Sequence, residues 1–168
     1  MKFEELKITK KIAFLRRLHA ELNNILFDGM LREDIVIDIC NINKYHEDDK
    51  VLASFMMHGA EVTLSPTGTG ILFDHVFAEE ASRIYDDDGE LEQLGFICCT
   101  MLHEMIHQYI YETGRTEDGS HKDIFMKESI KHGLGYYFEG VPETQYIEDA
   151  VINELEGTGI FEDFELLA

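Results

Sequence analysis

"TMLHEMIHQY" (residues 100–109) is the stretch that decides the fold, because it contains the pattern H-E-x-x-H. On a helix, His103 and His107 are four residues apart and therefore lie one turn apart on the same face. Two imidazole nitrogens in this arrangement can bind one zinc ion at about 2.0–2.1 Å. Glu104 lies about 100° further around the helix. From there it can take a proton from a water on the same ion, which is the general-base role of this glutamate in zinc hydrolases.

The pattern lies inside a longer apolar segment. We predict a helix from about Glu90 to Thr113 that ends at Gly114. The residues around the histidines give this helix its apolar surface; they are Met101, Leu102, Met105 and Ile106. The alternative interpretation is an amphipathic helix that carries two histidines and binds no metal. The position of the pattern within a long apolar helix favours the metal site.

The third metal ligand decides the class of site. A metzincin has a histidine six residues after His107, but Thr113 occupies that position. A glutamate from a later helix would define a gluzincin, and Glu128 or Glu139 could serve. The other candidate is His121, at the start of the helix that we predict after the loop "RTEDGS" (115–120). We favour His121, because a residue at a helix start projects toward the ion without bending the backbone.

The rest of the chain alternates helical and extended patterns, which predicts an α+β fold. The expected elements are a helix from Thr9 to Asp28-Gly29, a strand at 34–40, a hairpin of 51–57 and 61–65, a short strand or helix start at 71–77, a helix at 121–132 closed by Gly133, and a helix within 142–157 with Pro142 near its first turn.

Length and composition indicate one globular domain. The chain has 168 residues and 45% apolar residues, and no linker rich in glycine, serine or proline divides it. No apolar run approaches the roughly 20 residues that cross a bilayer. The N-terminus has no apolar signal-peptide core, and three cysteines do not suggest a disulfide framework. We therefore expect a cytoplasmic protein without a membrane partner.

The charge balance restricts the partners. The 14 Lys and Arg residues against 34 Asp and Glu residues give a net charge of −20. Such a surface repels nucleic-acid phosphates, so we expect no direct nucleic-acid binding. It keeps the protein in solution and can attract basic proteins. We expect a protein or peptide partner, either basic or unfolded.

The segments "LHEMIHQY" (102–109) and "DGSHKDIFMKE" (118–128) resemble the SprT-like zinc metalloprotease domain, the family of bacterial SprT and Spartan. Members carry H-E-x-x-H, a loop, and a third histidine followed four residues later by phenylalanine. The matching residues here are His103, Glu104, His107, His121 and Phe125. The segment "ELNNILFDGMLREDIVIDI" (21–39) is similar to the opening helix and first strand of the family. The resemblance covers roughly residues 10–138.

This resemblance implies a zincin-like domain, with helices packed on a small, mainly antiparallel sheet and H-E-x-x-H on a long central helix. It implies one Zn²⁺ per chain and a metalloprotease that hydrolyses peptide bonds. The implied roles are zinc ligands for His103, His107 and His121, and general base for Glu104. The substrate would pair with the edge strand within 51–65. The whole chain, 1–168, would be one domain with a core at about 10–138 and an acidic extension at 139–168.

Two departures from the family bear on function. Lys122 stands where members usually have glycine, which affects the loop and not the ligation. The C-terminal segment is acidic, and the three cysteines cannot form a four-cysteine zinc ribbon, which argues against a link to DNA–protein crosslinks. The competing function is a non-catalytic, zinc-stabilised acidic binding or adaptor module on a protease-like scaffold.

Several other residues could take part in chemistry but have simpler interpretations. We expect the cysteines of the apolar helix to belong to the core, His132 to interact with a helix C-terminus, and the isolated histidines to lie in turns or on the surface. These residues are Cys98, Cys99, His58, His75 and His132. The residue that stabilises the oxyanion is left open among four tyrosines, which are Tyr109, Tyr111, Tyr136 and Tyr137.

Overall fold

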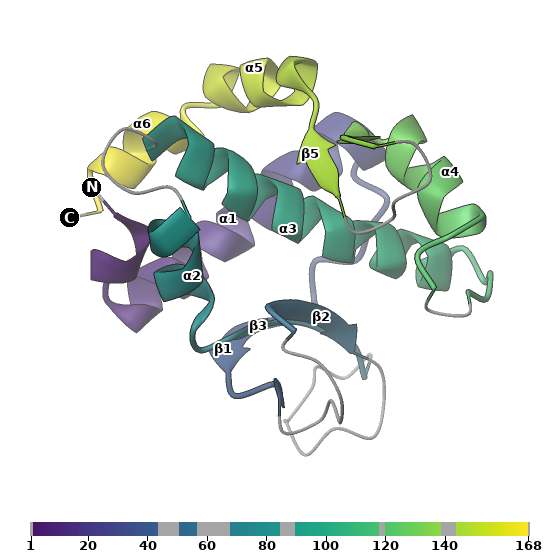
Figure 1. Cartoon of the computed structure of the whole chain (residues 1–168), viewed down its shortest axis with the longest axis horizontal. Helices are drawn as coiled ribbons and strands as arrows, with labels where there is room; N and C mark the ends of the chain where they lie inside the picture. The colour runs from purple at the N-terminus through teal and green to yellow at the C-terminus, as the bar shows by residue number, and fades with distance from the viewer. Residues whose placement is uncertain are drawn as a thin grey trace.

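Helix α3 (Glu90–Glu112) runs through the middle of the computed structural model, which describes residues 2–43, 51–56, 68–84, 90–117, 120–138 and 144–167 (Figure 1). Helices and two small sheets surround it, so the fold is of the predicted α+β class. The other elements are η1 (Phe3–Glu5), α1 (Ile8–Phe27), β1 (Val36–Cys40), β2 (Ala53–Met56), β3 (Gly70–Asp74), α2 (Phe77–Ile84), α4 (Ile124–Lys131), β4 (Leu134–Tyr136), β5 (Gln145–Ile147), α5 (Asp149–Gly157) and α6 (Ile160–Glu165).

Helix α3 is central because it is apolar on more than one face. Its nearly inaccessible apolar side chains are Leu94, Ile97, Cys98, Met101, Leu102, Met105, Ile106 and Ile110. The helix ends where Gly114 adopts a φ of +75° and donates its N–H to the carbonyl of Tyr111 at 3.0 Å. This left-handed conformation is the usual helix stop at glycine. The predicted helix and its end are therefore confirmed.

Helix α1 packs against α3 and contributes a row of buried residues at helical spacing, which are Phe14, Leu15, Leu18 and Leu22. It begins at Ile8, one residue before the predicted start at Thr9, and Lys7 is its N-cap residue. Its predicted end is confirmed. Asp28 has a φ of +52° and leaves the right-handed helical conformation.

The three-stranded sheet has the order β1-β3-β2, with β1 parallel and β2 antiparallel to the central strand β3. All five residues of β3 are buried. A strand covered on both faces has a continuous apolar pattern, which does not distinguish it from a buried helix. For this reason the sequence predicted either a short strand or a helix start at 71–77. The structure has both, since α2 begins at Phe77. The sheet is mixed and not mainly antiparallel, because the two strands beside β3 run in opposite directions.

Strand β2 lies within the first arm of the predicted hairpin, and the second arm at 61–65 lies outside the described residues. In the described part of the chain β2 pairs only with β3, for example Phe55 opposite Ile71. Helix α3 packs against β2. The described residues therefore leave β2 as an edge strand beside the H-E-x-x-H helix.

The prediction of one helix within 142–157 is wrong. Residues 145–147 form β5, which pairs antiparallel with β4, and α5 begins only at Asp149. The ring of Tyr146 covers Gly135 so closely that a Cβ atom there would lie 2.4 Å from the ring carbon Cζ. Tyrosine and isoleucine favour an extended strand, and Gly135, which has no side chain, leaves the space that the ring of Tyr146 occupies.

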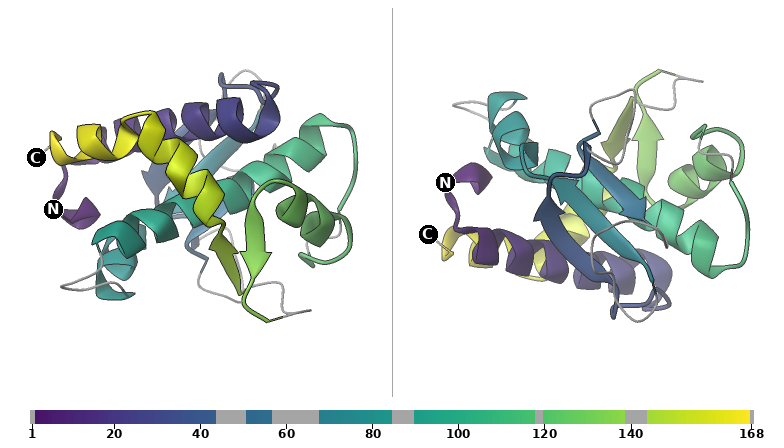
Figure 2. Two further views of the ribbon diagram at one scale, coloured as in Figure 1. Left: turned by 90° about the horizontal axis from the view of Figure 1, so that it is seen from above. Right: turned by 90° about the horizontal axis from the view of Figure 1, so that it is seen from below.

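The acidic C-terminal helices belong to the same hydrophobic core as the rest of the chain (Figure 2). Helices α5 and α6 pack on α1, and Phe164 lies against Phe14 with ring centroids 5.0 Å apart. Their other buried side chains are Val151, Leu155 and Ile160. Their acidic residues are on the outside and their apolar residues inside, which is ordinary helix amphipathicity. Within the described residues, no helix combines the length and the apolar composition that a bilayer crossing requires.

Candidate metal centre

Three histidines come together at the C-terminal half of α3. His103 and His107 lie one turn apart with ring centroids separated by 5.2 Å. The ring of His121 lies 4.9 Å from that of His103 and 5.1 Å from that of His107. One nitrogen from each ring lies within 4.8 Å of the others, close enough for the three to hold one metal ion. All three side chains are half-buried.

His121 reaches this position from a loop and not from a helix start, so the predicted helix at 121–132 begins too early. Helix α4 starts at Ile124. His121 and Asp123 have φ values of +60° and +49°, which a right-handed helix does not allow. The fully buried Phe125 anchors the loop, because its ring lies 4.4–4.9 Å from all three histidine rings. Strained backbone at functional sites persists where such packing fixes it.

Two residues orient the imidazoles of α3, and sequence analysis missed both. Nδ1 of His103 donates to Oε1 of Gln145 at 2.6 Å, and Nδ1 of His107 donates to Oε1 of Glu117. Carboxylate and amide oxygens only accept hydrogen bonds, so each Nδ1 carries a hydrogen and Nε2 is the nitrogen left to coordinate a metal ion. Such partners fix the tautomer that binds metal. The charged loop around Glu117 was a weak signal for one of them, and Gln145 had none.

Glu104 is buried beside the cluster, with 6% of its surface exposed. Its Oε2 accepts a hydrogen bond from the N–H of Phe55 on β2 at 2.7 Å, and its Oε1 lies 4.0 Å from Nε2 of His103. Burial raises the pKa of Glu104, while His107 and the N–H of Phe55 partly oppose this shift. The carboxylate is therefore held in place and has a higher proton affinity than an exposed glutamate.

The electrostatics of the cluster favour a neutral imidazole at His121. Burial lowers the pKa of His121, and the neighbouring His103 and His107 lower it further. Neutral imidazole is the form that binds a metal ion, so His121 needs to release no proton near neutral pH.

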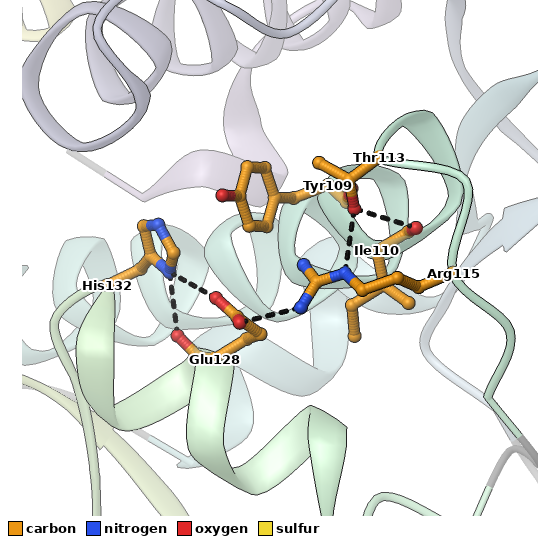
Figure 3. A network of polar contacts seen from close by, with 6 residues as sticks. All are labelled: Tyr109, Ile110, Thr113, Arg115, Glu128 and His132. Carbon is orange, nitrogen blue, oxygen red and sulfur yellow. Dashed lines mark hydrogen bonds and ion pairs between the residues drawn. The ribbon is translucent and has the colours of Figure 1, made fainter.

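The alternative ligand Glu128 has a different role. Its Oε1 accepts a hydrogen bond from Arg115 at 2.8 Å, and Nδ1 of His132 donates to its main-chain carbonyl at 2.8 Å (Figure 3). Arg115 also lies over the ring of Tyr109, so its side chain links the loop after α3 to both α3 and α4. Burial lowers the pKa of His132, so a neutral ring and not the predicted imidazolium contacts this helix C-terminus. Glu139, the other alternative, lies outside the described residues.

The remaining candidates do not join the cluster in the described part of the chain. Burial raises the pKa of Cys99 to about 12, so this half-buried thiol stays protonated, and Cys98 is fully buried. His75 lies at the surface, 3.4 Å from a carboxylate oxygen of Asp74. His58 lies outside the described residues.

A cavity of about 520 Å³ opens beside His103 and Glu104. Its floor is α3. One wall is formed by Leu52 and the start of β2, and the other by Tyr137, β5 and the first half of α5. Of the four candidate tyrosines, Tyr137 lines this cavity. Tyr109 instead packs against His132, and Tyr111 packs against Phe55.

The residues of the cluster fit a transition metal. Three neutral imidazoles suit zinc and its neighbours in the first row, whereas calcium and magnesium require mainly oxygen ligands. Two buried polar atoms close to the cluster, Oε2 of Glu117 and Nε2 of Gln145, have no hydrogen-bond partner among the described residues. Polar atoms left in this way are typical of a site that is completed by an ion, water or ligand.

Comparison of the chain with protein-family models, with curated proteins and with solved structures gives no match in any of the three. The resemblance to the SprT-like family therefore stays a prediction from the motifs. The geometry of the histidine cluster and of the cavity beside it carries the functional argument.

Proposed function

We propose that this chain is a zinc-dependent metalloprotease with a zincin-like fold, which hydrolyses peptide bonds in protein substrates. The observation that carries the proposal is the meeting of His103, His107 and His121 beside the buried carboxylate of Glu104. Zinc hydrolases use these groups to hold the ion and to move a proton. The resemblance of the motifs to SprT-like domains supports the same function.

A bound zinc ion supplies Lewis acidity and lowers the pKa of its water toward about 7. The residues of the chain do the rest. Gln145 and Glu117 keep the imidazoles of α3 in the ligand tautomer. Glu104 takes the proton from the attacking water and delivers it to the leaving amine. The N–H of Phe55 holds its carboxylate in position, and burial raises its proton affinity, as a general base near neutral pH requires.

The substrate path follows from β2. This strand pairs with β3 on one side, and on the other side the N–H of Phe55 points to Glu104. Leu52 and Ala53 line the cavity beside the metal centre. An extended peptide can add to such an edge through main-chain hydrogen bonds, which brings its carbonyl groups past the histidine cluster.

The experiment separates metal binding from catalysis. Protein purified without chelators or nickel resin should contain about one zinc ion per chain, and His103→Ala should lose it. Glu104→Gln should keep the zinc and abolish cleavage of an unfolded protein such as denatured casein, because only the proton acceptor is removed. A zinc-loaded wild type that cleaves no unfolded protein would contradict the proposal.

The competing function is a non-catalytic acidic adaptor, which the net charge of −20 favours. It predicts tight capture of a basic protein that is identical in the wild type and in Glu104→Gln, together with absence of turnover in both. The same two proteins therefore distinguish the two functions.

A further inference from the structure

The cavity beside the metal centre is a groove that extends along α3 toward its N-terminus. Its floor is one stripe of the helix, spaced three or four residues apart; the stripe consists of Glu92, Gly95, Phe96, Cys99, Thr100 and His103. From Glu92 to His103 the helix rises by about 16 Å. An extended peptide covers this length with about five residues.

Gly95 keeps the floor of the groove open. It lies inside α3 and does not have the positive φ that would require glycine. A Cβ atom at this position would meet nothing within 4 Å, so no packing contact requires glycine either. Glycine destabilises a helix interior relative to alanine. Neither the backbone conformation nor the packing of the chain requires glycine at this position. A peptide that runs along α3 and passes over Gly95 would require it, because glycine lets another backbone approach closely.

The chemistry of the walls indicates what the groove binds. Apolar side chains form much of its lining; they are Leu52, Phe96, Ile147 and Ile152. The acidic residues of the lining other than Glu104 are Glu92 and Asp149, and both are exposed. The described residues contribute no lysine or arginine to this lining. Lysine and arginine match this lining, because their apolar stems can pack on its apolar side chains and their positive charges can face its carboxylates.

We propose that this groove binds an extended segment of a basic polypeptide. Its main chain runs along α3 and passes over Gly95, and lysine or arginine side chains face Glu92 and Asp149, within about five residues of the residue that lies over His103. Only the description of this segment as a substrate rests on the proposed function. Its binding does not depend on catalysis.

The test measures binding in the zinc-loaded Glu104→Gln protein, which cuts no peptide if the proposed function holds. The probe is a fluorescein-labelled twelve-residue peptide of alanine and serine with two lysines, followed by fluorescence anisotropy at 0.15 M salt, a roughly physiological ionic strength. A second probe has norleucine in place of both lysines, which keeps the apolar stem and removes the charge. Zinc content is measured for every variant, so that an unfolded protein is recognised.

Gly95→Leu and Gly95→Ala test the groove, and Gly157→Ala is their control, because it adds a Cβ atom at an open helical glycine outside the cavity lining. The leucine side chain fills open space and blocks the floor two turns from His103, so we expect Kd for both probes to rise at least tenfold. The alanine Cβ also stands where the peptide backbone approaches, so we expect Gly95→Ala to raise Kd for both probes by a smaller factor than leucine, about twofold to fivefold, and Gly157→Ala to leave it unchanged. Unchanged binding by zinc-loaded Gly95→Leu would overturn the proposal.

The double variant Glu92→Gln/Asp149→Asn tests the charge, and Glu154→Gln/Glu156→Gln is its control. The control changes the net charge equally at exposed positions of α5 outside the groove. We expect the first pair to raise Kd about threefold to tenfold for the lysine probe only, and the second pair to have little effect. Equal weakening by both pairs, or equal wild-type affinity for the two probes, would overturn the proposal.

These results are separable from the proposed function. If the binding outcomes hold but zinc-loaded wild type cuts neither the lysine probe nor denatured casein, the groove is confirmed as a peptide site and the protease assignment fails. If wild type cuts casein but the groove variants bind and cut normally, the protease assignment holds and the groove proposal fails.

Discussion

The carboxylate of Glu117 accepts a hydrogen bond from Nδ1 of His107, although the two residues belong to different elements, a loop and a helix. This contact ties the loop that carries His121 to the helix that carries the other two histidines. Because one carboxylate both orients an imidazole and holds the loop, its loss should affect metal binding more than stability.

Replacing Glu117 should therefore weaken zinc binding. We expect Glu117→Ala to lower zinc affinity about 10- to 100-fold, the usual effect of removing the hydrogen-bond partner of a metal-binding histidine. Glu117→Gln keeps an acceptor oxygen and should lose less. Competition with a chromophoric chelator measures both, and exposed Glu156→Gln is the control. Equal affinity of Glu117→Ala and wild type would contradict this role.

Replacing Glu128 should affect stability and not metal stoichiometry. Glu128→Ala removes the partner of Arg115 and should lower the free energy of unfolding by about 1–3 kcal/mol. Glu128→Gln keeps an acceptor and should lower it less. Both should retain about one zinc per chain, since Arg115 and not the histidine cluster contacts this carboxylate. Loss of zinc from folded Glu128→Gln would restore Glu128 as a ligand candidate.

Acid should destabilise the metal-free protein through its buried histidines. Burial lowers the pKa of His19, and its hydrogen bond with Gln108 opposes this only partly. The unfolded chain, with a histidine pKa near 6.5, then binds protons that the folded chain does not. The free energy of unfolding should fall as pH drops below about 6.5 toward the folded pKa. Urea unfolding at pH 7.0 and 5.5 measures this.

Replacing His19 with a residue that does not titrate gives the control for this pH effect. His19→Gln should be less stable at both pH values, because its packing changes, but the difference between them should shrink. His121 and His132, whose pKa values are also lowered, would leave a residual difference. An unchanged difference in His19→Gln would show that His19 takes no part.

Gly135→Ala should disturb the β4–β5 pairing. The added Cβ would lie 2.4 Å from Cζ of Tyr146, so the ring must move, at a cost of about 1–3 kcal/mol in the free energy of unfolding. Gly157→Ala is a matched control, since a Cβ there meets nothing within 4 Å. Adding Tyr146→Ser to Gly135→Ala removes the clash and should reduce its cost. Equal stability of the two alanine variants would contradict the close approach.

The sequence predicted the features that depend on local pattern. The helix of residues 90–113 was predictable because its apolar spacing persists over several turns and a glycine ends it. The two histidines of α3 were predictable for the same reason, since four-residue spacing on a helix fixes their relation. The approach of His121 was inferred from loop length and from a family resemblance, and its loop conformation was missed because positive φ values of non-glycine residues leave no clear pattern.

The missed features depend on contacts between distant segments. Gln145 lies 42 residues after His103, and no local pattern predicts that β5 crosses α3 at that point. The mixed sheet was missed because strand order and direction are properties of the whole topology. The strand at 145–147 was read as helix because three residues are too few for a period to be recognised.

The hydrogen bond between Gln145 and His103 can form only late in the synthesis of the chain. The ribosome releases all three histidines before it has made β5, α5 and α6, so the growing polypeptide holds an imidazole whose orienting amide does not yet exist. A nascent chain should therefore bind the proposed metal ion more weakly than the complete chain until β5 has docked. Premature termination before position 145 would leave a product that retains the whole H-E-x-x-H signature and yet lacks the device that keeps its first imidazole aligned.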